Sequence, residues 1–254
     1  AYDHMFLDGL EDAYEPGRAM GTFAQETANA YQMTREEMDA YSIESLARAN
    51  RAIASGAFAD EVVPVTVSTR AGDVVVEHDE APSKGRPDKI PQLKPAFAKD
   101  GTITAATSSS ISDGAAALVL TRASVADAKG LAPVARVVAT AAHAQAPAQF
   151  TTAPIPAIQK VLERAGWSVD DVDLFEVNEA FACVAMFAMR DLGIPHEKIN
   201  VNGGGTALGH PIGASGARII VTLINTLKQL GKKRGVASLC IGGGEATAIA
   251  VELV

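Results

Sequence analysis

Two glycine-rich segments near the end of the sequence carry one histidine and one cysteine. Residues 202–218 hold six glycines with His210 among them, and residues 240–246 place Cys240 shortly before a run of glycines. Glycine lets a backbone approach another group closely, and exposed backbone N–H groups stabilise an oxyanion. An imidazole that titrates near neutrality and a thiol suit proton transfer in acyl chemistry. The two segments therefore predict an acyl-transfer site.

A predicted helix and a predicted strand position these groups. After His210, apolar residues recur at helical spacing through residues 219–227, and Gly231 follows as a C-cap. A helix N-terminus close to His210 favours negative charge. Asn178 and Glu179 follow a predicted strand at residues 172–177, where open α/β sheets place ligand-contacting residues. The alternative is that Asn178 only caps the next helix.

The order of predicted elements indicates an α/β layered fold. From residue 132 onward, strands and helices alternate and two strands end the chain. Residues 1–97 lack this order: helices are expected at 23–31 and 34–55, and strands at 62–67 and 74–76. Thr34 and Glu37 predict a capping box at the start of the second helix, which ends near Gly56. Prolines in residues 79–96 predict irregular structure, and residues 115–120 predict a buried strand or helix. A short strand is also expected at residues 199–201.

Composition limits the classes of function. The 254 residues carry a formal net charge of −8, which argues against general nucleic-acid binding and against a polybasic membrane surface. Cys183 and Cys240 are the two cysteines, so a disulfide scaffold is not expected. We expect a reducing, cytoplasmic setting instead. No apolar run approaches the ~20 residues of a membrane span. The first residue is Ala1 instead of methionine, and we expect a processed or truncated piece.

The two glycine-rich segments match a known pair of motifs. Residues 209–218 read G-H-P-x-G-x-S-G-x-R, and residues 240–244 read C-x-G-G-G. In this order and about thirty residues apart, they make the sequence resemble the thiolase family, acetyl-CoA C-acetyltransferases and 3-ketoacyl-CoA thiolases. The resemblance implies a thiolase-like layered α/β fold in three parts. These are a loop domain at 1–97, the closing segment of the N-terminal half at 98–130, and the C-terminal half at 131–254.

The resemblance also implies catalytic roles. The histidine matching His210 helps to deprotonate a nucleophilic cysteine, and its ring N–H faces a thioester oxygen. The cysteine matching Cys240 moves a proton on the acetyl carbon. Asn178 would hold a water in one oxyanion hole, with Glu179 in support, and the Gly242 N–H would contribute to the other. Cys183, inside a predicted helix among small apolar residues, is interpreted as structural.

A second set of residues is implied in substrate and coenzyme A binding. Its members are Ser109, Met20, Ala180, Phe181, Phe150, Lys84, Arg86 and Lys89. Ser109 would contact the pantetheine arm, although a loop serine often only satisfies backbone groups. The three basic residues would meet the phosphates, although a basic stretch is usually a solvated surface. Phe150 would crowd long acyl chains, or only plug its loop onto the core.

The implied activity is acyl transfer between acyl-CoA and acetyl-CoA, as Claisen condensation to 3-oxoacyl-CoA or the reverse thiolysis. Thiolases carry their nucleophilic cysteine before the region matched by Ala1, so we expect this isolated chain to be inactive without that N-terminal segment. A non-catalytic CoA-binding or assembly subunit is the alternative. A ketoacyl synthase is less favoured because Cys240 stands in the last glycine loop.

The remaining expectations concern context. CoA thioesters serve as substrates, and neither a tightly bound cofactor nor a metal is expected. A homo-oligomer, dimer or tetramer, in cytoplasmic fatty acid metabolism follows from the resemblance.

Overall fold

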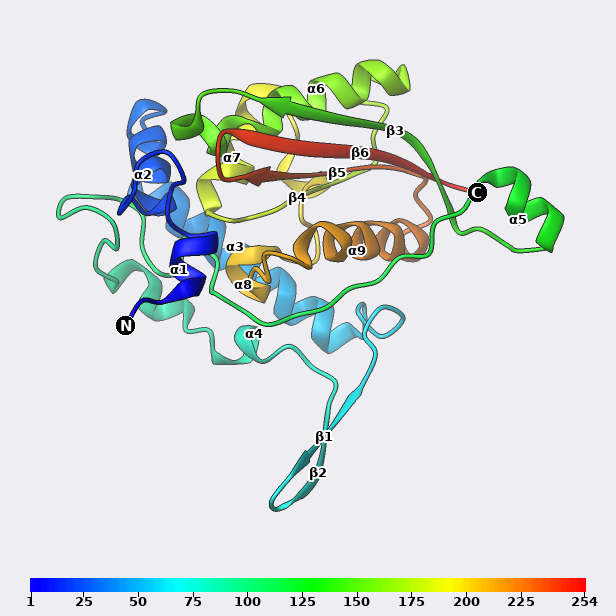
Figure 1. Ribbon diagram of the computed structural model, residues 1–254, viewed down its shortest axis with the longest axis horizontal. Helices are drawn as coiled ribbons and strands as arrows, with labels where there is room; N and C mark the ends of the chain where they lie inside the picture. Colours follow the sequence, from blue (N-terminus) through cyan, green and yellow to red (C-terminus); the bar gives the residue numbers. More distant parts are fainter.

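The computed structural model describes all residues, 1–254, and is built around one four-stranded mixed sheet (Figure 1). The strand order is β3 (Ala135–Ala144), β6 (Glu245–Leu253), β5 (Arg234–Ile241) and β4 (Leu174–Val177). β6 is antiparallel to both of its neighbours, whereas β4 and β5 are parallel. The sheet confirms the α/β fold class, and the parallel pair brings the ends of two strands to one edge.

Helices cover both faces of the sheet. α6 (Pro154–Ala165) packs against β3 and β6, and α9 (Ser215–Gln229) packs against β4 and β5 on the other side (Figure 1). α6 buries apolar residues at helical spacing, including Ile158 and Val161, and ends at Gly166 with a φ of 69°. α9 buries Ile219, Leu223 and Leu227 in the same way.

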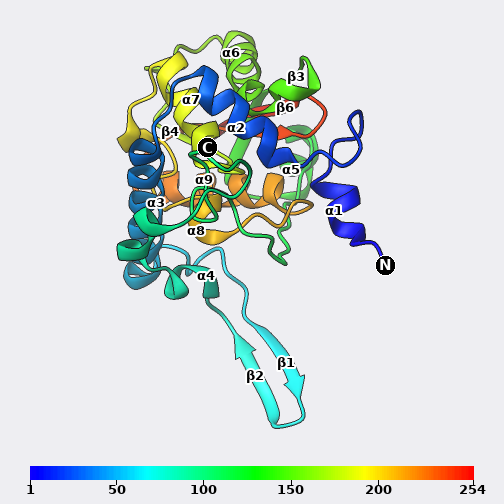
Figure 2. The same cartoon turned by 90° about the vertical axis from the view of Figure 1, so that its left-hand side faces the viewer.

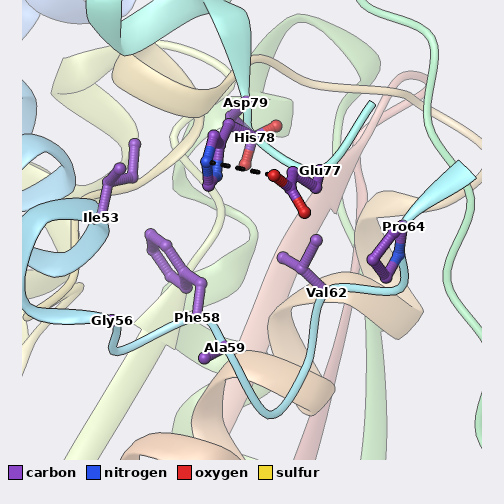
Figure 3. Close-up of a pocket in the computed structure, with 9 residues that line it drawn as sticks. All are labelled: Ile53, Gly56, Phe58, Ala59, Val62, Pro64, Glu77, His78 and Asp79. Atoms are coloured by element: carbon purple, nitrogen blue, oxygen red, sulfur yellow. Dashed lines mark ion pairs between the residues drawn. The ribbon is translucent and has the colours of Figure 1, made fainter. Parts of the chain in front are cut away.

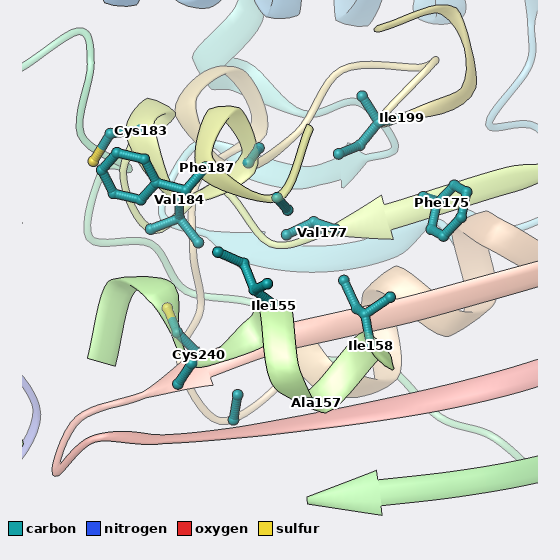
Figure 4. Close-up of a cluster of buried hydrophobic side chains, with 14 of the residues drawn as sticks. Ile155, Ala157, Ile158, Phe175, Val177, Cys183, Val184, Phe187, Ile199 and Cys240 are labelled. Atoms are coloured by element: carbon teal, nitrogen blue, oxygen red, sulfur yellow. The ribbon is translucent and has the colours of Figure 1, made fainter. Parts of the chain in front are cut away.

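The main hydrophobic core lies between α6, the sheet and α7 (Ala182–Leu192) (Figure 4). Val184 and Phe187 of α7 meet Ile155 and Ile158 of α6 in this cluster. Both cysteines belong to it as well, Cys183 on α7 and Cys240 near the end of β5.

The first 130 residues form helices and loops around this body. The helices are α1 (His4–Gly9), α2 (Met20–Ala30), α3 (Arg35–Ser55) and α5 (Ala123–Lys129). α3 begins with the predicted capping box, in which Thr34 and Glu37 satisfy each other's backbone N–H groups, and ends at Gly56 with a φ of 74°. Shorter pieces connect the later strands: η2 (Pro147–Thr152), η3 (His196–Lys198) and α8 (Gly205–Leu208).

A β-hairpin projects from this region (Figure 2). β1 (Val65–Thr69) and β2 (Gly72–Val76) pair in register, and every residue of both strands is exposed. The two predicted strands are confirmed, the first with its start shifted by three residues.

Three expectations were wrong in detail. Residues 79–96 contain α4 (Glu80–Lys84) and η1 (Pro87–Gln92). Pro82 and Pro87 sit in first turns, where their missing N–H costs nothing, whereas Pro91 lies inside η1. Residues 115–120 form no strand or helix, and Val119 is 99% exposed. No strand lies beside them to pair with their backbone groups. The expected strand at 199–201 is only a bridge between Phe175 and Ile199.

No helix combines the length and apolar composition that a membrane crossing requires.

Candidate active site

The carboxyl edge of the parallel pair β4–β5 gathers the predicted catalytic residues. Asn178 directly follows β4, and its backbone N–H donates to the carbonyl of Ser238 on β5 at 2.9 Å. Cys240 lies two residues further along β5. Because the strands run in the same direction, the amide and the thiol come from the same edge of the sheet.

His210 reaches this edge from the glycine-rich segment. Its Nε2 atom lies 3.4 Å from the Nδ2 atom of Asn178. Its backbone N–H donates to the carbonyl of Ser110 at 3.1 Å, and its backbone bridges to Ile111. The imidazole therefore stands where residues 108–111, the end of β4 and the start of α9 meet.

Ser215 fixes the tautomer of His210. The Ser215 hydroxyl donates to the Pro211 carbonyl at 3.0 Å, so it accepts a hydrogen bond from Nδ1 of His210 at 2.5 Å. The neutral ring then carries its proton on Nδ1 and a lone pair on Nε2. In this tautomer Nε2 becomes a donor only after it takes up a proton, and the expected ring N–H toward a thioester oxygen remains a prediction.

Burial sets the charge of both reactive groups. It lowers the pKa of His210 from 6.5 to about 4, with a further lowering by the positive charge of Arg218. Burial also raises the pKa of Cys240 from 9.0 to about 12. At neutral pH the site therefore holds an uncharged imidazole that can accept a proton and a thiol that can give one.

The two cysteines have different surroundings (Figure 4). Cys240 is 7% exposed and stands next to the glycine turn that joins β5 to β6, whereas Cys183 is fully buried on α7. Burial raises the pKa of Cys183 above its usual value. This burial supports the structural interpretation of Cys183.

The glycine turn after Cys240 is held from two sides. A Cβ atom on Gly242 would lie 3.3 Å from the sulfur of Met20, so Met20 is a neighbour of the turn. On the other side, Gln145 donates its backbone N–H to the carbonyl of Gly244 at 2.9 Å. Gly244 has a φ of 88°, and a Cβ there would lie 2.2 Å from the carbonyl oxygen of Gln145. Only glycine fits this close backbone contact.

Three further predicted residues border the same site. The backbone N–H and the hydroxyl of Ser109 both donate to the carbonyl of Ala180 at 3.0 Å. Phe181 is the N-cap residue of α7 and packs edge-on against Phe97, with ring centroids 5.9 Å apart. Ser109, Ala180 and Phe181 thus line up beside Asn178.

Four other predicted residues lie elsewhere. Lys84 and Arg86 are exposed at the end of α4, which packs on α3 and α8, and Lys89 is exposed on η1. Lys84 forms an ion pair with Glu80 at 2.6 Å. Phe150 on η2 is 3% exposed and belongs to the main core cluster with Cys240. The roles of these four residues remain predictions.

A separate cavity of about 230 Å³ lies at the base of the β1–β2 hairpin (Figure 3). Ile53, Phe58 and Val62 form its apolar side, and His78 and Glu77 its polar side, with their side chains 3.9 Å apart. None of the residues that line this cavity belongs to the predicted site.

Several residues that shape the site were not predicted. They are Tyr41, Ser45, Gln145, Asn200, Thr206 and Ser215. Ser215 stands in the motif at residues 209–218 and could have been found there. Tyr41 and Ser45 are four residues apart and share one face of α3, where two polar groups point inward together. Gln145 and Asn200 carry no sequence signal, because only the tertiary fold brings them to the site.

Comparison with known proteins agrees with this architecture. The model of the family described as "Thiolase, N-terminal domain" matches residues 1–124, and that of "Thiolase, C-terminal domain" matches residues 131–253. An acetyl-CoA acetyltransferase of Rhizobium meliloti is 48% identical, over 98% of this chain and 64% of the relative.

Solved structures are similar as well. The crystal structure of the Bacillus anthracis acetyl-CoA acetyltransferase has a TM-score of 0.93 and 44% identity, over 96% of this chain and 62% of the other. The Acat5 thiolase of Ascaris suum in complex with coenzyme A has a TM-score of 0.90 and 41% identity, over 99% of this chain and 64% of the other.

The layered sheet and both family models define the class of this α/β protein: the chain belongs to the thiolase family. It spans about 63% of the length of the curated relatives that it matches. The boundaries at residues 97 and 130 remain predictions.

The protonation state of His210 is directly testable. We expect its ring to stay neutral, with the proton on Nδ1, from pH 8 down to about pH 5, because its pKa is about 4. In the unfolded chain the ring takes up a proton near pH 6.5. The contribution of His210 to stability is therefore complete above pH 6.5 and is lost as pH falls toward 4. Ring ¹⁵N NMR measures the titration, and a midpoint near 6.5 would contradict this assignment.

The glycine turn provides a matched pair of variants. Gly243 and Gly244 both have positive φ, at 94° and 88°, so alanine strains the backbone at either position by about 1–2 kcal/mol. Gly244→Ala also drives a methyl group into the Gln145 carbonyl, whereas the nearest atom to the new methyl at Gly243 is 3.8 Å away. Denaturant unfolding should show a larger loss of stability for Gly244→Ala. Equal losses would mean that the Gln145 contact does not hold the turn.

Proposed function

We propose that this chain forms part of an enzyme that transfers acyl groups between CoA thioesters, condensing acyl-CoA with acetyl-CoA or cleaving 3-oxoacyl-CoA. The observation that carries this proposal is the neutral imidazole of His210 beside the Asn178 amide, at the sheet edge that also bears the Cys240 thiol. The relatives support this proposal because curated ones are named acetyl-CoA acetyltransferases. A related thiolase has also been solved in complex with coenzyme A.

His210 acts first as a base. The lone pair on Nε2 accepts the proton of the nucleophilic thiol, and the resulting thiolate attacks the substrate carbonyl. The protonated Nε2–H then donates a hydrogen bond to the oxyanion that develops on the carbonyl oxygen. When the substrate is acyl-CoA, the bond from this carbon to the CoA sulfur breaks, an acyl-enzyme thioester forms, and the CoA thiolate takes up the proton from Nε2. Asn178 supports the same oxyanion through a water molecule held by its side-chain amide.

Cys240 moves the second proton. In thiolysis the carbon–carbon bond breaks and its electron pair stays on the acetyl-CoA fragment. The Cys240 thiol protonates that carbon. In condensation the deprotonated Cys240 removes the same proton, and the resulting carbanion forms a bond to the acyl carbon. The thioester bond to the nucleophilic cysteine breaks, and that cysteine leaves as a thiolate and takes up the proton from Cys240. The Gly242 N–H would stabilise the enolate oxygen from the glycine turn.

The acyl group is carried by a cysteine other than the two in this chain. Cys183 is fully buried on α7, and Cys240 already serves as the proton donor and acceptor. Thiolase sequence outside residues 1–254 supplies the nucleophile, and the isolated chain is inactive by itself. The alternative is a CoA-binding or assembly subunit. It would be favoured if this chain binds CoA but shows no acyl transfer after that segment has been added.

Coenzyme A binding is proposed along the loops beside the site. Ser109, Met20, Ala180 and Phe181 lie next to the catalytic edge, suited to the pantetheine arm. Lys84, Arg86 and Lys89 would meet the phosphates, and Phe150 would limit the acyl chain. A homo-oligomeric enzyme of cytoplasmic fatty acid metabolism is the setting proposed from the resemblance.

The role of Cys240 is tested in the complete enzyme. Cys240→Ser should still form the acyl-enzyme from acetyl-CoA, because His210 activates the nucleophile. Condensation and thiolysis should fall by about 10²- to 10⁴-fold, the usual contribution of a general acid–base group. Labelled acyl-enzyme and steady-state thiolysis of acetoacetyl-CoA measure the two steps. Cys183→Ala, a change at the fully buried cysteine of α7, is the control, and near-normal thiolysis by Cys240→Ser would refute the assignment.

The placement of the CoA phosphates is tested by charge reversal. Lys84→Glu combined with Arg86→Glu should raise KM for CoA substrates, and more so at low salt, because exposed charges are screened. Lys228→Glu combined with Lys232→Glu changes the net charge equally at exposed positions around the end of α9 and serves as the control. If both pairs alter KM equally at low ionic strength, the phosphates bind elsewhere.

A further inference from the structure

The carboxylate of Glu179 is buried without a cationic partner. Its side chain is fully buried, and five neutral donors reach its two oxygens. Oε1 accepts from the Tyr41 hydroxyl and the Asn200 amide, each at 2.8 Å. Oε2 accepts from the Ser45 hydroxyl at 2.9 Å, and from the Thr206 backbone N–H at 3.1 Å and hydroxyl at 2.6 Å. A charged group away from water needs such a set of donors.

These donors come from three separate parts of the chain. Tyr41 and Ser45 belong to α3, Asn200 follows η3, and Thr206 lies in α8, which ends two residues before His210. Glu179 itself is the neighbour of Asn178. One side chain therefore joins the two segments that carry the catalytic amide and imidazole to a helix more than 130 residues away in the sequence.

Asn200 extends the same frame to the end of β4. Its side-chain oxygen accepts from the Val177 N–H at 2.9 Å, and its amide donates to the Val177 carbonyl at 2.8 Å. Arg48 of α3 donates in turn to the carbonyl of Ile199 at 2.7 Å. The backbone immediately before Asn178 is thus fixed by the group that also binds Glu179.

The glycine segment packs directly on this carboxylate. A Cβ on Gly204 would lie 2.3 Å from the carboxyl carbon of Glu179, and the Gly204 N–H donates to the Ser45 hydroxyl at 3.0 Å. Ser45 therefore binds both the glycine segment and Glu179. At this position the sequence needs glycine for the approach to a buried side chain.

We propose that Glu179 is the positioning residue of this site: its carboxylate holds Asn178 and the segment leading to His210 in the relative placement that proton transfer requires. Glu179 contacts no reacting atom in this role. The inference rests on the proposed function and adds a role for α3, whose hydroxyl groups supply two of the five donors.

The substitution Glu179→Gln separates charge from size. Glutamine has one acceptor oxygen and one NH₂ group, so only one of the two carboxylate positions keeps its acceptor. If the NH₂ takes the Oε1 position it faces the Asn200 amide, and if it takes the Oε2 position it faces the Thr206 backbone N–H. Neither orientation satisfies both donors, and the loop must shift.

Glu61→Gln is the matched control. The Glu61 carboxylate also joins the first third of the chain to a later helix, accepting from Thr222 and Asn225 of α9 at 2.9 Å each. It makes no contact with Asn178, Glu179 or the segment before His210. A loss of general stability through a weakened tie between chain segments would therefore appear in both variants.

The experiment measures kcat and KM for acetoacetyl-CoA thiolysis in the complete enzyme, thermal unfolding, and the ring ¹⁵N signals of His210. For Glu179→Gln we expect kcat to fall by about 10²-fold with a much smaller change in KM, since a misplacement of about 1 Å has this effect. The Nε2 signal of His210 should shift because its contact with Asn178 changes. Glu61→Gln should leave kcat and the His210 signal as in the unmodified enzyme.

Several outcomes would overturn the inference. A Glu179→Gln enzyme with normal kcat and an unshifted His210 signal would do so, as would equal losses of kcat in both variants. Where Glu179→Gln does not fold, Thr206→Val, which loses one donor, is compared with Thr206→Ser, which keeps both. Equal kcat values for that pair would also count against the inference. An unmodified enzyme without thiolysis would refute the proposed function, and the His210 signal would then test Glu179 by itself.

Discussion

The parallel pairing of β4 with β5 is the constraint on which the site depends. It places the residue after β4 and the end of β5 at one edge, so that Asn178 and Cys240 arrive together although they are 62 positions apart in the sequence. β6 returns antiparallel beside β5, which requires a tight turn after Cys240. The glycines of that turn follow from the strand geometry, and Gly244 in particular from its contact with Gln145. The position of the Cys240 thiol beside the backbone N–H groups of the glycine turn is thus a product of sheet topology.

Burial gives the two reactive groups opposite but complementary pKa shifts. Removing solvent penalises the charged form of each group, which lowers the pKa of His210 and raises that of Cys240. In the uncharged form, neither the half-buried His210 nor Cys240 in the main core needs a charged partner. The neutral imidazole, oriented by Ser215, presents the Nε2 lone pair toward the Asn178 amide, and the Cys240 thiol keeps its proton at neutral pH.

The sequence predicted the parts of the site and of the fold that local rules determine. The capping box at Thr34, the helices ended by glycine and most of the alternation of elements after residue 132 depend on neighbouring residues. The structure confirms them, with the expected strand at 199–201 as the exception. Motif spacing identified His210 and Cys240. By contrast, residues 115–120 have the composition of a buried strand, yet a strand also requires a neighbouring backbone, which local composition does not reveal. Local composition does not reveal the polar contacts of Asn200 either, because its partners lie far away in the sequence.

Two buried carboxylates near the end of β4 show how the fold separates its charges. Glu176 lies 3.7 Å from a guanidinium nitrogen of Arg218, too far for a hydrogen bond, and burial raises its pKa to about 8. Glu179, three residues later, instead accepts hydrogen bonds from five neutral donors, which belong to α3, α8 and Asn200. The cation of this region is thus directed toward Glu176 and lowers the pKa of His210, while hydroxyl and amide groups satisfy Glu179. A cation bound at Glu179 would add a second positive charge near the site. Neutral donors hold together the segments that carry Asn178 and His210 without adding a second positive charge. The number of these donors, and not their charge, stabilises the buried Glu179 carboxylate.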